Sequence, residues 1–303
     1  MTSPRKPFPF AARAGLVALA LVVAVPATRA GDGSGSLPAP DSSSVSSAAA
    51  TDPDDMEVDK AEPDFTVIDL PTNLRLPRHK LAFRLTHRFS RPLGQGDFHD
   101  LVSDFFGFDG GAQIGLGLRF GLFSGTQLAF YRLSDRTIQF SLQRELLRQD
   151  QHPVGLSVVG SIEGRDNFGQ DYSPAVQLVV SRKLGSRGAV YAIPAWVGNT
   201  NLTAENVTPD DSTLVLGLGA RLLVRPSVAL VGEYQPRLAG YRGNRGSGDR
   251  ASLLTFGIEK RVGGHAFQLN FSNDLGTTPA QTARGQQGSH DWFIGFNITR
   301  KFY

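Results

Sequence analysis

From residue 79 to the C-terminus, apolar and polar side chains alternate along the chain with a period of two. In AQIGLGLRFG, for example, Ile114, Leu116 and Leu118 occupy one phase, and Gln113 and Arg119 occupy the other. This is the period of a strand whose two faces meet different surroundings. About twelve such segments follow one another, each close to the length of a tilted membrane strand. The predicted strands span residues 79–89, 110–121, 125–133, 136–147, 153–164, 174–184, 188–198, 212–224, 227–237, 251–262, 265–273 and 290–303.

The connections between these segments alternate in length. Every second connection is short, such as LFSG, RP and VGG, whereas most of the others are long, such as NTNLTAENVTPDD. Tight turns on one side of a membrane and extended loops on the other produce this rhythm. Residues 71–303 are therefore predicted to form an all-β, transmembrane, antiparallel up-and-down barrel of about 12 strands (roughly 10–14). The alternative is a soluble β-sandwich, whose outer faces would be rich in Thr, Lys and Glu rather than in the Gly, Ser, Gln and Arg found here.

The first 70 residues differ in composition from the rest of the chain. Basic residues precede an apolar run at 14–25, and small residues follow it, so residues 1–30 are predicted to be a signal peptide cleaved between Ala30 and Gly31. Residues 31–70 are rich in Ser, Ala, Pro and acidic side chains. This composition predicts a disordered acidic linker in the periplasm.

The last predicted strand, in SHDWFIGFNITRKFY, has a feature that the other strands lack. Its apolar residues alternate and its last residue is aromatic, which resembles the C-terminal strand of bacterial outer-membrane β-barrel proteins. The resemblance implies that the barrel-assembly machinery of a Gram-negative bacterium reads this strand during insertion. The residues that match the insertion signal are Trp292, Phe296, Ile298, Phe302 and Tyr303.

A narrower resemblance rests on three stretches: NLRLPRHKLAFRLTHRFSRPL, FFGFDGGAQIGLGLRFG and TIQFSLQRELLRQ. They are similar to a family of bacterial barrel proteins without an established function, over residues 71–200. The resemblance implies the fold and an outer-membrane location, and it implies no catalytic residues. Aromatic side chains near the strand ends are expected to form interfacial girdles. These are Tyr131, Tyr191, Trp196, Tyr234, Trp292 and Tyr303.

The composition excludes several kinds of site. The chain has no Cys, so it holds neither a disulfide nor a thiolate. Its 6 histidines are scattered without metal-ligand spacing, so we expect no metal and no cofactor. No His stands in phase with the predicted lumen serines, so we expect no enzyme. The predicted barrel is basic, and this favours lipid head groups and small anionic solutes as partners, with no nucleic acid.

Two similar stretches, GLGLR and GLGAR, place Arg119 and Arg221 in the lumen phase of strands on opposite sides of the barrel. With the neighbouring glycines, the two arginines predict a constriction for anions. In the alternative, the arginines form ion pairs with acidic residues and fill a plugged interior. The further lumen candidates are Arg84 and Arg88 near the outer mouth, and the acidic residues Glu163, Glu233 and Glu259.

Three functions stay open from the sequence. The favoured one is passive, porin-like diffusion of small solutes with a mild preference for anions. The second is a plugged, non-transporting barrel that serves as a scaffold, an adhesion surface or an anchor for a periplasmic partner docked on residues 31–70. The third is a barrel enzyme.

Overall fold

The computed structural model describes residues 59–303 except 109, 203–210, 242–251 and 286–290. Its strands form one antiparallel sheet of 13 segments, and the sheet closes because β1 pairs with both β2 and β13. The strands are β1 (Leu81–Phe89), β2 (Ala112–Phe123), β3 (Thr126–Leu133), β4 (Ile138–Leu147), β5 (Gly155–Gly164), β6 (Gln170–Lys183), β7 (Gly188–Val197), β8 (Thr213–Arg225), β9 (Val228–Gln235), β10 (Arg237–Gly240), β11 (Leu253–Val262), β12 (His265–Ser272) and β13 (Phe293–Phe302).

β9 and β10 are two parts of one strand. Both pair with β8, and Pro236 between them has no N–H to continue the ladder. The barrel therefore has 12 strands, which confirms the number predicted from the alternation. Each predicted segment corresponds to one observed strand, and the largest difference at a strand start is in β6, which begins at Gln170 rather than at residue 174.

The two faces of the sheet divide as the period of two requires. In β2, Leu116 and Leu118 point outward and are 49% and 46% exposed, whereas Gly117 faces the lumen and is buried. An apolar outer band is what a barrel needs in a bilayer. The expected girdle is wrong for three residues. Tyr131 and Tyr191 stand in the inward phase of β3 and β7, and Tyr303 packs beside the buried Phe65. Among the described residues, no helix is long and apolar enough to cross a membrane.

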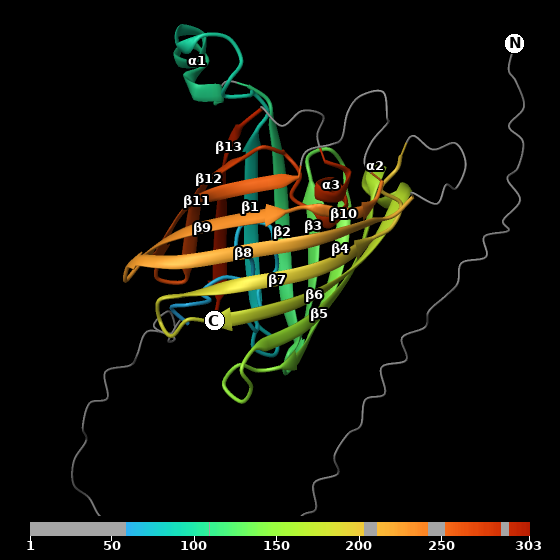
Figure 1. The fold of residues 1–303 in the computed structure, drawn as a ribbon, viewed down its shortest axis with the longest axis vertical. Coiled ribbons are helices and arrows are strands. Elements are labelled where there is room, and N and C mark those ends of the chain that lie inside the picture. The colour runs from blue at the N-terminus through green and yellow to red at the C-terminus, as the bar shows by residue number, and fades with distance from the viewer. Residues whose placement is uncertain (1–58, 109, 203–210, 242–251, 286–290) are drawn as a thin grey trace, which may run out of the picture. The chain divides into compact units, whose positions relative to one another are not determined.

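The connections place all short helices at one end of the barrel (Figure 1). They are α1 (Phe98–Ser103) and η2 (Phe105–Gly107) between β1 and β2, α2 (Arg165–Phe168) between β5 and β6, and α3 (Pro279–Arg284) between β12 and β13. We call this end the long-loop end. The opposite, short-turn end carries the tight connections and the C-terminus.

The structure differs from the expected linker at residues 59–70, which lie inside the barrel. With residues 71–76 they form a hairpin, here called the N-terminal hairpin (residues 59–76), that enters at the short-turn end and folds back at its tip. An antiparallel bridge joins Thr66 to Pro71, and the backbone N–H of Thr72 donates to the carbonyl of Phe65 over 3.0 Å. The predicted signal peptide, its cleavage site and residues 31–58 lie outside the described residues.

A second insert reaches the lumen from the long-loop end. Ala280 and Ala283 of α3 are 1% and 0% exposed and pack against inward side chains of β6, β7 and β8. Arg284, at the end of this helix, forms an ion pair of 3.4 Å with Glu163 of β5. Thus both ends of the barrel send chain into its interior.

Candidate functional site

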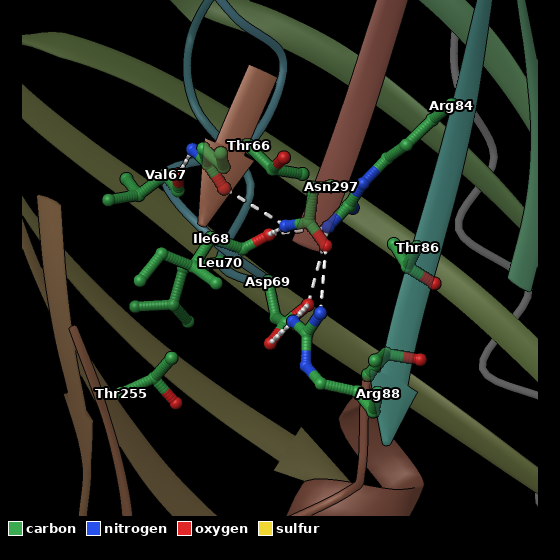
Figure 2. Close-up of polar contacts among 12 residues, drawn as sticks. Thr66, Val67, Ile68, Asp69, Leu70, Arg84, Thr86, Arg88, Thr255 and Asn297 are labelled. Carbon is green, nitrogen blue, oxygen red and sulfur yellow. Dashed lines mark hydrogen bonds and ion pairs between the residues drawn. The ribbon is translucent and has the colours of Figure 1, made fainter. Parts of the chain in front are cut away.

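The tip of the N-terminal hairpin carries an acidic side chain between two arginines of β1 (Figure 2). Asp69 forms ion pairs of 3.0 Å with Arg88 and 3.3 Å with Arg84. Arg88 is fully buried, and its second terminal nitrogen donates to Oδ1 of Asn297 over 2.8 Å. Arg84 also donates to the carbonyl of Ile68. A carboxylate of the hairpin, rather than one of the barrel wall, therefore neutralises Arg84 and Arg88.

Glu233 of β9 holds the backbone of the tip. The N–H groups of Ile68, Asp69 and Leu70 all donate to its Oε1, over 2.5, 2.8 and 2.8 Å. Three converging N–H groups make a site that favours an anion, and hydrogen bonds to a charged acceptor are the strong kind. The tip thus docks through its main chain, on a carboxylate that is 3% exposed.

Arg119 and Arg221 do not oppose each other across free space, because consecutive residues of the hairpin occupy it. The guanidinium of Arg119 lies 5.1 Å from the ring centroid of Phe65. Arg221 forms an ion pair of 2.5 Å with Glu259 of β11 and donates to the carbonyl of Thr66 over 3.2 Å. The pairing that the sequence left as an alternative is the one found for Arg221.

Other side chains occupy the space beside the lumen glycines. A Cβ on Gly217 of β8 would lie 2.5 Å from Leu70 at the hairpin tip, and a Cβ on Gly115 would lie 2.1 Å from the hydroxyl of Tyr131. That hydroxyl bonds with Thr86 and, over 3.0 Å, with Thr277 of the β12–β13 loop. The width that the glycines provide is therefore filled rather than open.

One side of the hairpin is apolar and packs on an apolar part of the inner wall. Val67, Ile68 and Leu70 form a buried cluster with side chains of β5, β6, β7 and β9. In β7, Ile193 is 0% exposed in the lumen while Trp196, in the opposite phase, is 41% exposed outside. Burial of such side chains stabilises docking by about 25 cal/mol per Å² of apolar surface.

The base of the hairpin is held at the short-turn end. Lys183 of β6 pairs with Asp59 and lies 4.0 Å from Glu62, which accepts the N–H of Asn73 over 2.9 Å. Burial raises the pKa of Glu62, because the charged carboxylate loses water, and both the N–H of Asn73 and the charge of Lys183 act against this rise. Docking of the base therefore depends on pH.

Glu62→Gln is expected to reduce that pH dependence. A raised pKa means that the contribution of this carboxyl to docking is complete below its undocked pKa and is lost as the pH rises through the docked pKa. Gln keeps an oxygen for the N–H of Asn73, so the variant should dock more firmly than the wild type at neutral pH. Hydrogen–deuterium exchange of residues 59–76 at pH 5 and 8, corrected for intrinsic rates, measures this. An unchanged difference between the two pH values would contradict it, and Asp166→Asn on an exposed loop is the control.

Three cavities follow one another along the hairpin on the side of β1–β6. Their volumes are about 100 Å³ near the tip, about 10 Å³ in the middle and about 240 Å³ at the short-turn end. The middle cavity has room for roughly one water. There, Gln127 donates to the carbonyl of Leu74 over 3.1 Å, and Gln143 donates to that of Thr72 over 2.7 Å. The smallest of the three cavities is therefore lined by neutral amides of the barrel wall that bond to the hairpin, and not by arginines of the wall.

The residues of the predicted insertion signal divide between the two faces. Phe296, Ile298 and Phe302 point outward, and the ring of Trp292 lies 5.5 Å from that of the outward Phe256. Tyr303 instead packs beside Phe65, Leu76 and Ala82 at the base of the hairpin. Burial raises its pKa to about 12. In the described ranges, no group of three or more His, Asp or Glu side chains is placed to hold a metal.

The contacts of the hairpin were not predicted from the sequence. A signal was present in FTVIDL, an apolar run that follows a long polar stretch, and in GAVYAIPAWV, which is apolar in both phases. A barrel strand that is apolar on both faces has something apolar inside to pack against.

A family model described as a membrane-bound beta-barrel domain (DUF5777) matches residues 64–302. This confirms the resemblance seen over residues 71–200. No curated protein matches the sequence significantly.

The chain is similar in fold to solved structures that include the following three. The NanC porin is 8% identical, with a TM-score of 0.48, over 73% of this chain and 100% of that chain. The KdgM porin is 7% identical, with a TM-score of 0.43, over 74% and 99%. The outer membrane protein Omp33 of Acinetobacter baumannii is 8% identical, with a TM-score of 0.41, over 74% and 98%. At such low identities and TM-scores, these likenesses carry no argument about function.

Proposed function

Because the chain belongs to the family of membrane-bound β-barrel domains, we propose that it is an outer-membrane channel of a Gram-negative bacterium that its own N-terminal hairpin holds shut. The observation that carries the proposal is the capture of the hairpin tip, where Glu233 accepts three backbone N–H groups and two arginines bind Asp69. The family match begins at residue 64, so the tip belongs to the matched domain.

The orientation follows from the lengths of the connections. Outer-membrane barrels carry short turns on the periplasmic side and longer loops outside. The hairpin enters at the short-turn end, so its base and the acidic residues 31–58 would face the periplasm. A periplasmic partner of that segment would then act on the hairpin from the side where it enters. No catalytic step is part of this proposal.

Withdrawal of the hairpin is compatible with an intact barrel. Each strand pairs with a strand on both sides, and β1 pairs with β13, so the ladder needs no hydrogen bond from the hairpin. Much of the exposed wall would be polar, including Gln127, Gln143 and Asn297, and water can replace the hairpin there. Small solutes would pass, with a preference for anions because Arg84 and Arg88 lose Asp69.

The rival function is a permanently plugged barrel that serves as a scaffold or anchor. The apolar packing of Val67, Ile68 and Leu70 against the wall favours it, because their exposure to water is unfavourable. The channel and the plugged scaffold predict different results when the polar contacts of the hairpin are weakened. The hairpin of a channel would then withdraw, whereas that of a plugged scaffold would stay in place.

Glu233→Ala is expected to convert a silent barrel into one with brief, discrete openings in a planar bilayer. The change leaves three N–H groups without their acceptor, at a cost of about 1–3 kcal/mol to docking. Glu163→Ala is the matched control, because Glu163 is equally buried and binds α3 rather than the hairpin. It should stay silent. Silence of both variants, with barrel folding verified by heat-modifiable migration, would favour the plugged scaffold, and openings in Glu163→Ala alone would assign closure to α3.

A further inference from the structure

A cavity beside the hairpin tip arises from a row of small side chains. Register places Arg119 of β2 opposite Ala129 of β3, which pairs with Ser141 of β4, then Ser161 of β5, then Ala175 of β6. Directly paired residues share one face of a sheet. This row faces the lumen, and its short side chains leave a cavity of about 100 Å³ between the wall and the hairpin.

Longer polar side chains bound the cavity above and below this row. Tyr131 and Gln139 belong to the row nearer the long-loop end, and Gln143 and Gln177 belong to the row nearer the short-turn end. Phe65, of the hairpin, also lines the cavity. Asp64, Asp69 and Arg84 line it as well, so hydroxyl and amide groups share the lining with two carboxylates, two guanidiniums and apolar side chains.

Arg119 is the arginine in this region without an acidic partner. Arg84 and Arg88 share Asp69, and Arg221 binds Glu259. Within the described part of the chain, no carboxylate lies within 4.0 Å of Arg119, whose contacts are the ring of Phe65 and a long bond of 3.4 Å to Gln143. A guanidinium has five N–H donors, and leaving a charge of this kind uncompensated in a barrel interior is costly.

The neighbouring hydroxyl and amide groups are also available. Over the described residues, no protein group forms a hydrogen bond with the side chains of Ser141, Ser161 or Gln177. They line the same cavity as Arg119. The carboxylate of Asp64, which also lines the cavity, accepts hydrogen bonds from the N–H of Phe65 and the hydroxyl of Thr299 and forms no ion pair with Arg119. A guanidinium that forms no ion pair, beside free hydroxyl and amide groups, is an arrangement that recognises an anion bearing hydroxyls.

We propose that this cavity binds a small hydroxyl-bearing carboxylate, with Arg119 holding the carboxylate and the serine and glutamine side chains holding its hydroxyls. The volume has room for roughly seven to ten waters, which suits an acid of three or four carbons and excludes an oligosaccharide. The site needs the docked hairpin, because Phe65 lines it and contacts Arg119. Binding to the closed barrel can be measured whether or not the hairpin ever withdraws.

The test is isothermal titration of the full, refolded chain with D-glycerate in a chloride-free buffer, with glycerol as the uncharged probe. The wild type should bind glycerate and not glycerol. Arg119→Gln should lose binding by at least about 100-fold, and Arg119→Lys should lose about tenfold, because it keeps the charge and loses the planar fork. Arg132→Gln, an exposed arginine of neighbouring β3, is the matched control and should bind as the wild type does.

A second variant separates the site from any effect of Arg119 on folding. Ser161→Val fills the cavity and keeps the charge, and valine is well tolerated in strands. It should abolish glycerate binding while the thermal transition of the barrel is retained. Equal binding by Arg119→Gln and the wild type, or no binding by a correctly folded wild type, would overturn the proposal. Binding and conductance are read separately, so a wild type that binds glycerate, together with a Glu233→Ala variant that stays silent, overturns only the proposed opening.

Discussion

A chain that begins at Pro77 is expected to conduct ions through a planar bilayer in discrete steps, whereas the full chain stays closed. The truncation removes the N-terminal hairpin and leaves every strand, since β1 begins at Leu81. The middle cavity, of about 10 Å³, loses its wall at residues 73–76 and opens toward the space near the tip. Conductance should rise from none to a level well above noise, the largest effect expected for this protein.

Ion selectivity supplies the control for this truncation. Without Asp69, the side chains of Arg84 and Arg88 keep their charge and lose their partner, so the truncated chain should prefer anions. Replacing both arginines by Gln in the truncated chain should lower the ratio of anion to cation permeability without closing the pore. A truncated chain that folds, as judged by heat-modifiable migration, and yet carries no current would contradict closure by the hairpin.

Asp69→Asn is expected to release the hairpin tip in the full chain. Asp69 is 3% exposed at its side chain and Arg88 is 0% exposed, so the change leaves a fully buried guanidinium without a counter-charge. Breaking a buried pair in this way costs about 3 kcal/mol or more, which corresponds to roughly a 100-fold rise in the population of the undocked tip.

Labelling measures this release directly, because the chain has no Cys of its own. Ile68→Cys places a thiol at a position that is 0% exposed when the hairpin is docked. Its reaction with a membrane-impermeant maleimide should accelerate about 100-fold when Asp69→Asn is added. The matched control is Asp166→Asn, which weakens a surface ion pair of 2.5 Å with Arg136 and should leave the rate unchanged. Similar rates in the two backgrounds would show that the ion pair does not hold the tip.

The sheet was predictable because the sequence features that specify it lie within each strand and each connection. Alternation sets which face of each strand meets lipid, and connection length sets which end carries loops, so Leu116 and Gly117 could be assigned to their faces without the structure. Arg84, Arg88, Arg119 and Arg221 were placed in the lumen for the same reason. Their partners were not predictable, because alternation says which side of a wall a residue faces and nothing about what lies beyond it.

The position of the hairpin inside the barrel was not predicted, for a related reason. Its contacts with Glu233 and Asn297 span 163 and 229 residues, and it uses backbone groups that every residue has. Residues 31–70 are polar and acidic as a whole, and the apolar run that begins at Phe65 is only a small part of them. The girdle errors are of a simpler kind, since Tyr131, Tyr191 and Tyr303 lie close to strand ends and yet point inward.

The contacts between the base of the hairpin and β13 impose an order on assembly. Thr299 donates to Asp64 over 2.8 Å, Lys301 donates to the carbonyl of Pro63, and the last residue, Tyr303, packs beside Phe65. These pairs join the hairpin to the final strand of the chain, so docking of the hairpin cannot be completed until that strand has been synthesised. An unfinished barrel, open between β1 and β13, lacks the wall that these residues of the hairpin dock on. The pairing of β13 with β1 closes the barrel, and β13 also completes the wall on which the hairpin docks.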